Sequence, residues 1–124
     1  MVRSVGLDIV EIARIRRDIT RFGDRFVNRV LGETERSLYD KRKDKDSFLA
    51  GRLAAKEAVV KGLGTFLDRR PPLRAIQVSS EAGGAPVLAL PSDIQRSLIG
   101  VTCHLSITHE RSFAAAVAVF EERR

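Results

Sequence analysis

The chain has 124 residues, 44% of them hydrophobic and 31% charged, which is the composition of an ordinary globular protein large enough to build its own core. Its one cysteine, Cys103, excludes an internal disulfide, no cysteine and histidine residues have zinc spacing, and no uncharged run reaches the roughly 18 residues of a membrane helix. The sequence therefore predicts a single cytoplasmic domain over residues 1–124, and the net charge of +6 predicts an acidic partner: nucleic acid, anionic lipid, an acidic protein or a phosphorylated small molecule.

Residues 2–10 alternate in a way that predicts a strand with two different faces. One face is apolar and the other contains a carboxylate: Val5, Leu7 and Ile9 against Gly6, Asp8 and Val10. Taken alone, Asp8 is more simply a helix cap or an exposed strand end than a functional group. Its small and apolar neighbours nevertheless make Asp8 a candidate site residue if the rest of the chain contains other carboxylates in similar surroundings.

Residues 12–22 predict an amphipathic helix, and shorter helices are expected over residues 24–31 and 33–41. The buried stripe of the first helix is expected to be Ile12, Ile15, Ile19 and Phe22. Arginines line the other side and continue into the second helix: Arg14, Arg17, Arg21, Arg25 and Arg29. Since only two acidic residues lie nearby, this ridge is either a solvated face or a docking surface for an anionic partner.

The central helix is predicted to run from about residue 46 to residue 63, and it is small or apolar nearly all round. Such a helix is usually buried, and buried charges are costly unless they are paired, hydrogen-bonded or bound to a metal. Four charged residues break its pattern: Arg52, Lys56, Glu57 and Lys61. The helix is therefore the first candidate for a functional site, although for Lys56 a structural salt bridge is as plausible as a catalytic role.

The rest of the chain is predicted to be mostly β. The expected elements are a strand over 73–80, a turn over 81–86, a strand over 87–90, a short helix over 92–98 and strands over 101–107 and 113–120. The last strand is apolar enough to be covered on both faces, and in so small a chain an oligomer is one way to supply the second cover. The predicted class is α+β, a mainly antiparallel sheet with a long central helix packed on it.

Asp8 and Glu57 are the two acidic residues that the pattern places in apolar surroundings. Two carboxylates, together with water and phosphate oxygens, are a usual way to hold Mg²⁺. Lys61 lies one turn beyond Glu57 and could meet a phosphate, and Arg52 and His109 offer further positive or hydrogen-bonding groups. Singly these residues have simpler explanations, such as a helix-stabilising Glu–Lys pair or a structural histidine, and only their combination indicates a site.

Three stretches of the chain form a recognisable set. They are Gly6-Leu7-Asp8-Ile9-Val10-Glu11, the run from Phe48 to Ala58 with Lys61, and Leu105-Ser106-Ile107-Thr108-His109 followed by the alanines at 114–116. In this order they resemble the bacterial holo-acyl-carrier-protein synthases, which are small 4′-phosphopantetheinyl transferases, and the middle stretch is the specific one.

The resemblance implies an α+β fold that assembles as a homotrimer, with active sites at the subunit interfaces. It implies that the chain transfers the phosphopantetheine arm of coenzyme A to a serine of apo acyl carrier protein and releases adenosine 3′,5′-bisphosphate. It further implies a requirement for Mg²⁺ and a role in fatty acid biosynthesis. Such a reaction is catalysed mostly by positioning and charge stabilisation, and either Glu57 or a metal-bound water would take the proton of the serine.

The resemblance also assigns site residues. Asp8 and Glu57 match the metal-binding carboxylates, and Glu57 and Lys61 are the expected catalytic residues. The expected coenzyme A contacts are Lys41, Arg42, Lys43, Arg52, Lys61, Gly64, Pro86, Ser106 and His109. The expected docking residues for the carrier protein are Arg14, Arg17, Arg21 and Arg25. Ala85 and Phe66 depart from the family's usual residues, so one contact to coenzyme A and the loop after the central helix are expected to differ.

Other functions fit parts of the sequence. A small nucleic-acid-binding module would explain the positive charge, but one tyrosine and no tryptophan disfavour base stacking, and the module would not explain Asp8 and Glu57. Another Mg²⁺-dependent phosphoryl or nucleotidyl transferase is possible in principle, although no P-loop motif is present. An accessory domain of a larger synthase is disfavoured by the start at Met1. The preferred partners are therefore acyl carrier protein and coenzyme A, without nucleic acid or membrane.

Overall fold

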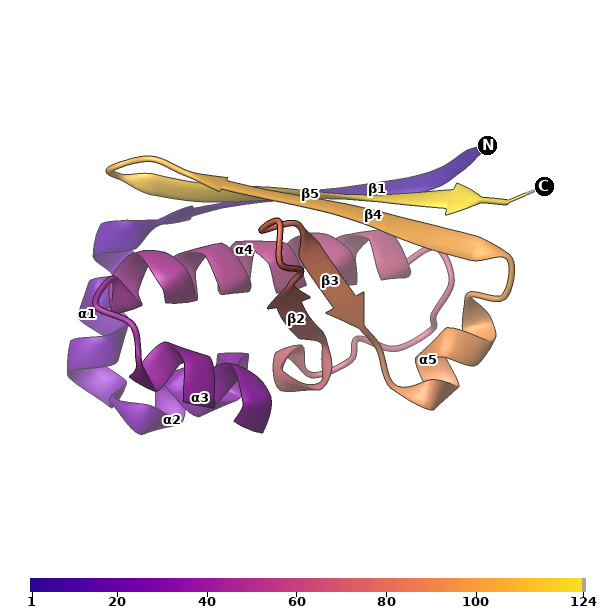
Figure 1. The fold of residues 1–124 in the computed structure, drawn as a ribbon. Coiled ribbons are helices and arrows are strands. Elements are labelled where there is room, and N and C mark those ends of the chain that lie inside the picture. The colour runs from indigo at the N-terminus through magenta and orange to yellow at the C-terminus, as the bar shows by residue number, and fades with distance from the viewer. Residues whose placement is uncertain (124) are drawn as a thin grey trace.

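Helix α4 (Lys45–Leu63) lies lengthwise beneath a three-stranded sheet, and the other elements pack around this pair (Figure 1). The computed structural model describes residues 1–123. The other elements, in chain order, are β1 (Val2–Glu11), α1 (Ile12–Phe22), α2 (Asp24–Val30), α3 (Glu33–Asp40), the 3-10 turn η1 (Leu73–Ala75), β2 (Gln77–Ser80), β3 (Pro86–Ala89), α5 (Ser92–Ser97), β4 (Val101–His109) and β5 (Phe113–Glu122).

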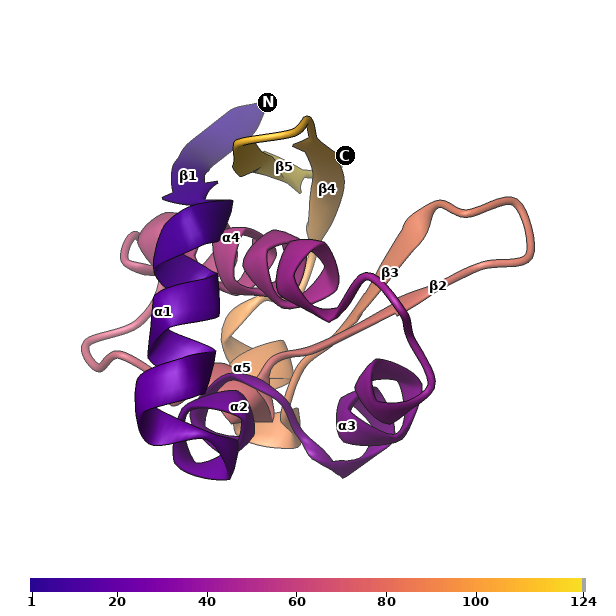
Figure 2. The same ribbon diagram turned by 90° about the vertical axis from the view of Figure 1, so that its left-hand side faces the viewer.

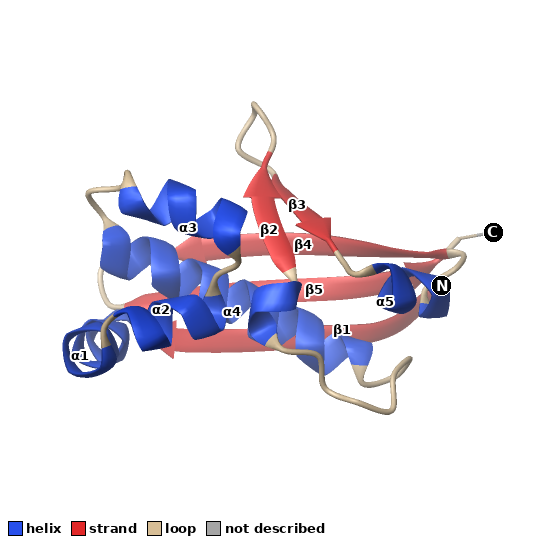
Figure 3. Cartoon of the chain, turned by 90° about the horizontal axis from the view of Figure 1, so that it is seen from below, coloured by secondary structure: helices blue, strands red, loops and turns tan. Residues whose placement is uncertain are grey.

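The long strands form an antiparallel sheet in the order β1-β5-β4. A separate antiparallel hairpin, β2-β3, projects to one side of α4 (Figure 2). Seen from below, α4 crosses the three strands while α1 and α5 lie at opposite ends of the sheet (Figure 3). This arrangement confirms the predicted α+β fold with a long central helix. Among residues 1–123, no helix is both long and apolar enough to cross a membrane.

Two local predictions are wrong. The strand expected over 73–80 begins only at Gln77, because a 3-10 turn follows the two prolines at 71 and 72. In this turn the Ala75 and Ile76 amides donate to the carbonyls of Pro72 and Leu73. Phe22, expected in the buried stripe of α1, is 44% exposed at the end of that helix, where the Arg21 guanidinium lies over its ring.

Small residues let the inner face of the sheet approach α4 closely. On β5 this face consists of Ala114, Ala116, Ala118 and Phe120, all buried. On β1 the closest approach is at Gly6, where an added Cβ would lie 1.7 Å from the carbonyl oxygen of Ala58. Phe120 in turn needs Gly62, because a Cβ there would lie 2.3 Å from the phenyl ring. The prediction that the central helix is buried nearly all round is therefore confirmed.

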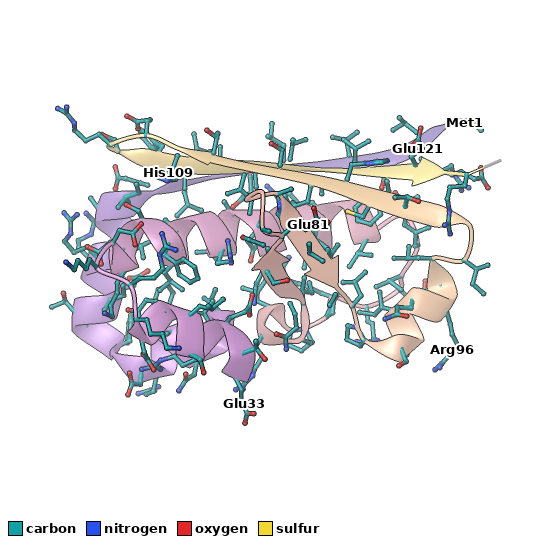
Figure 4. The ribbon with its side chains drawn as sticks, viewed as in Figure 1. Met1, Glu33, Glu81, Arg96, His109 and Glu121 are labelled. Carbon is teal, nitrogen blue, oxygen red and sulfur yellow. The ribbon has the colours of Figure 1, made fainter. Side chains whose placement is uncertain are left out.

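The outer face of the sheet is apolar and uncovered in the single chain. Val5, Leu7 and Ile9 of β1 are 58%, 64% and 66% exposed. They pair with Val119, Val117 and Ala115 of β5, which are half-buried. Side chains stand on this surface with no helix above them (Figure 4). The sequence predicted that both faces of β5 are covered. The described part of the chain covers only the inner face.

Candidate active site

Asp8 and Glu57 line one cleft of about 240 Å³, here called the acidic cleft. The alternation of β1 turns Asp8 toward α4, on the same side as Gly6 and Val10. Glu57 comes from the middle of α4, and its side chain is 23% exposed while that of Asp8 is 18% exposed. The remaining lining residues are Ile9, Val10, Arg14 and Leu53. The fold therefore brings together in one cleft two carboxylates that are 49 residues apart along the chain.

Each carboxylate of the acidic cleft has a positive partner. Lys61 Nζ donates to Asp8 Oδ1 at 3.1 Å and to the Leu7 carbonyl at 2.9 Å. Arg70 Nη2 donates to both oxygens of Glu57, at 2.8 and 2.7 Å. The sequence indicated Lys61 but not Arg70, which lies in the loop after α4. An arginine in a loop carries no local signal, and only the tertiary fold brings it to Glu57.

The donor set fits Mg²⁺. Within residues 1–123, no group of three or more histidine, cysteine, aspartate or glutamate side chains could hold a metal ion. Zinc sites and protein-enclosed calcium sites need more protein ligands than Asp8 and Glu57 provide. Mg²⁺ commonly takes one or two carboxylates and completes its shell with water and substrate phosphates. The cleft therefore suits a magnesium ion that arrives with, or is completed by, a phosphorylated substrate.

A second cleft, of about 200 Å³, lies at the other edge of the sheet and is here called the basic cleft. Arg42, Arg52 and His109 line it together with Ser80 and Phe48. Both arginine guanidinium groups lie 4.7 Å from the centre of the Phe48 ring. His109 lies at the end of β4 close to the first turns of α4 (Figure 4).

Arg52 is the most unusual residue of the basic cleft. Its Nε is buried, and among the described residues it has no hydrogen-bond partner. Burial lowers the pKa of its guanidinium, which reflects the cost of holding a cation away from water. A half-buried cation with an unpaired N–H donor is suited to an anionic ligand such as a phosphate.

The structure does not bring all the predicted coenzyme A contacts to these clefts. In the described chain, the predicted residues that line neither cleft are Lys41, Lys43, Lys61, Gly64, Pro86 and Ser106. Lys61 still joins the acidic cleft through Asp8. Ser106 points to the outer face of β4, in register with Val117, and Gly64 follows the end of α4. Their assignment to coenzyme A stays a prediction.

The predicted docking arginines lie on an exposed surface beside the acidic cleft. A groove of about 220 Å³, the arginine groove, is lined by Arg14, Asp18, Phe22, Arg25, Phe26 and Arg29. Arg14 lines both this groove and the acidic cleft, so the two surfaces are continuous. Arg17 and Arg21 are exposed on α1. Arg17 Nη2 lies 3.5 Å from Glu11 Oε1.

Lys56 belongs to the core and to neither cleft. Its Nζ donates to the Val30 carbonyl at 2.6 Å and to Glu35 Oε1 at 2.5 Å, and both side chains are almost fully buried. Burial lowers the pKa of Lys56, and the bond to Glu35 opposes that shift. Of the two roles left open for Lys56, the structure shows the salt bridge.

Comparison with known proteins places the chain among enzymes of one kind. Residues 4–118 match the model of the 4′-phosphopantetheinyl transferase superfamily. A holo-[acyl-carrier-protein] synthase of Azoarcus is 41% identical over 125 residues, covering 99% of this chain and 100% of the relative. The crystal structure of the synthase from Neisseria meningitidis superimposes with a TM-score of 0.88 at 30% identity, covering 98% of this chain and 100% of the other. That of the Helicobacter pylori synthase in complex with coenzyme A has a TM-score of 0.81 at 34% identity, covering 94% and 99%.

Proposed function

The chain belongs to the 4′-phosphopantetheinyl transferase superfamily, and we propose that it is a holo-acyl-carrier-protein synthase that moves the phosphopantetheine arm of coenzyme A to a serine of apo acyl carrier protein. Adenosine 3′,5′-bisphosphate is the other product. The reaction depends on Mg²⁺ and serves fatty acid biosynthesis in the cytoplasm. The chain is similar over nearly its full length to enzymes named holo-[acyl-carrier-protein] synthase. A synthase of similar structure was crystallised with coenzyme A.

The observation that carries this proposal is the acidic cleft and its continuity with the arginine groove. Asp8 and Glu57 would hold Mg²⁺, and the ion would neutralise charge on the pyrophosphate of coenzyme A. The arginine groove would bind the acidic carrier protein, and Arg14 joins that groove to the cleft where the serine must react. A nucleic-acid-binding module needs no such pair of partly buried carboxylates.

The residues of the chain supply positioning and charge. Lys61 Nζ, which bonds to Asp8 and to the Leu7 carbonyl, would stabilise negative charge that develops on the phosphates. The Glu57 carboxylate is the chain's own candidate to accept the proton of the attacking serine. Arg42, Arg52 and His109 of the basic cleft would hold the remaining phosphate of coenzyme A.

The assembly that we propose is a homotrimer in which each active site is shared between two subunits. Support comes from the uncovered apolar face of the sheet, with Leu7 and Ile9 largely exposed on β1. Further support comes from the separation of the two clefts, since Asp8 lies on β1 and His109 on β4, at opposite edges of the sheet. Sedimentation should therefore show a trimer, and a monomer at micromolar concentration would count against shared sites.

Mass spectrometry of apo acyl carrier protein tests the reaction. The carrier is incubated with the enzyme, coenzyme A and Mg²⁺, with and without a chelator. We expect a mass gain of one phosphopantetheine that the chelator prevents. An unchanged carrier mass under all conditions would contradict the proposed function, and a gain that persists in chelator would contradict the role of the metal.

A further inference from the structure

The Arg70 guanidinium bonds to both oxygens of the Glu57 carboxylate. Its Nη2 lies 2.8 Å from Oε1 and 2.7 Å from Oε2, so one nitrogen engages both oxygens at nearly equal distances. A divalent cation held by Glu57 would need at least one of the same two oxygens. Arg70 and the cation therefore compete for one position.

Arg70 can leave this position without a change of fold. It lies in the loop between α4 and η1, its side chain is 60% exposed, and the next residue, Pro71, is buried and holds the backbone. In residues 1–123, the hydrogen bonds of its side chain all go to Glu57. Lys61 differs, because it also bonds to the Leu7 carbonyl and keeps that anchor if Asp8 binds a metal.

Glu57 lines the acidic cleft, so a guanidinium that lets go of this carboxylate starts from the edge of the cleft. The substrate brings a pyrophosphate to that same cleft, and arginine binds phosphate oxygens with two parallel hydrogen bonds as readily as it binds carboxylates. The pyrophosphate therefore gives Arg70 a new anionic partner when the cation takes Glu57.

We propose that Arg70 exchanges partners during the reaction cycle: it holds Glu57 while the divalent cation is absent, and it binds the pyrophosphate of the substrate once the cation occupies Glu57. This inference rests on the proposed function, because it uses the metal site at Asp8 and Glu57. It makes Arg70 a substrate-binding residue that also sets the affinity for the metal.

The exchange predicts opposite effects of one substitution on two affinities. In Arg70→Gln, Mn²⁺ alone should bind roughly three- to tenfold more tightly than in the wild type, because the competitor for Glu57 is gone. With Mn²⁺ saturating, coenzyme A should bind roughly three- to tenfold more weakly, because one phosphate contact is gone. Electron paramagnetic resonance of free Mn²⁺ measures the first affinity, and titration calorimetry measures the second.

Arg69→Gln is the matched control. Arg69 is the preceding residue and is also half exposed, but its partner is Asp93 on α5, outside both clefts. It should change neither affinity. An Arg70→Gln protein with wild-type affinity for Mn²⁺ would overturn the competition, and one with wild-type affinity for coenzyme A would overturn the binding of phosphate.

Asp8→Asn separates this inference from the proposed function. If that substitution abolishes Mn²⁺ binding while Arg70→Gln has no effect, the metal site stands and the exchange alone is wrong. If Mn²⁺ binding does not depend on Asp8, the proposed metal site is wrong and the exchange fails with it.

Discussion

The carboxylates of the acidic cleft are each paired with a cation from a different part of the chain. Lys61, from the last turn of α4, reaches Asp8, and Arg70, from the following loop, reaches Glu57. A partly buried carboxylate is costly to the fold unless it is paired or hydrogen-bonded. These pairs therefore allow the chain to fold with both carboxylates already in the cleft, before any metal or substrate binds.

Glu57→Gln should remove activity without unfolding the protein. The amide cannot replace a charged metal ligand, so Mg²⁺-dependent transfer should fall by roughly 100-fold or more. The pair with Arg70 is partly exposed, so the free energy of unfolding should change by less than about 1 kcal/mol. Carrier modification and urea denaturation measure the two quantities. Asp93→Asn, which removes a carboxylate paired with Arg69 outside the clefts, should leave both unchanged; near-normal turnover in Glu57→Gln would refute the metal assignment.

At the scale of elements, the buried pair of Lys56 and Glu35 connects four segments. Lys56 lies on α4 and Glu35 on α3, and Lys56 also binds the Val30 carbonyl at the end of α2. Glu35 accepts from the Gly32 amide at 3.0 Å and from the Val78 amide of β2 at 2.9 Å. The β2-β3 hairpin, which contributes Ser80 to the basic cleft next to Arg52, is thus fixed to α4 through this pair.

Lys56→Met should destabilise the protein by about 3–5 kcal/mol, because it leaves Glu35 buried without its counter-ion. Adding Glu35→Gln should recover part of that loss, since the second substitution removes the uncompensated charge and keeps a carbonyl acceptor. Urea denaturation of the single and double variants gives the comparison. The exposed pair of Arg3 and Glu122 is the control, and Arg3→Met should cost no more than about 1 kcal/mol. A double variant less stable than Lys56→Met would contradict this account.

Gly6→Ala tests the contact between β1 and α4. The new methyl group would meet the Ala58 carbonyl oxygen at 1.7 Å and the Gly62 amide nitrogen at 3.0 Å, and both are backbone atoms that cannot rotate away. The strand must move, at a cost of about 1–3 kcal/mol, and Asp8 moves with it. We expect lower stability in urea and weaker Mn²⁺ binding. In Gly83→Ala no atom lies within 4 Å of the added methyl, so that variant should behave as the wild type.

Periodic and compositional signals predicted most of these elements and part of the site. The alternation of β1 and the all-round apolar character of α4 predicted that Asp8 lies on a strand and Glu57 on a buried helix, because both patterns are local. Partners that depend on tertiary structure had no such signal: Arg70 reaches Glu57 from a loop, and Glu35 reaches Lys56 from 21 residues away. The turn at Leu73–Ala75 was also missed, since its apolar residues extend the pattern of the strand that follows.

At the scale of the whole molecule, the proposed reaction draws on two separate clefts of one chain. Under the proposed function, the carboxylates of the acidic cleft and Lys61 beside them would serve a metal and a pyrophosphate, whereas Arg52 and Arg42 of the basic cleft would serve another phosphate. Strand β5 lies between the two edges of the sheet, and α4 lines both clefts. In the trimer that we propose, copies meet through the exposed apolar face of β1 and β5, and the acidic cleft of one subunit lies next to the basic cleft of another.

Mixing two inactive variants tests whether sites are shared. Glu57→Gln disables the acidic cleft and Arg52→Gln disables the basic cleft, so each homotrimer should be inactive. If every site combines an acidic cleft from one subunit with a basic cleft from another, random assembly of a one-to-one mixture leaves about a quarter of the sites with both clefts intact. Co-refolding the two variants should therefore restore about a quarter of wild-type transfer, measured by carrier modification. If both clefts of one site come from the same chain, every chain in the mixture carries a defect, and co-refolding would restore no activity.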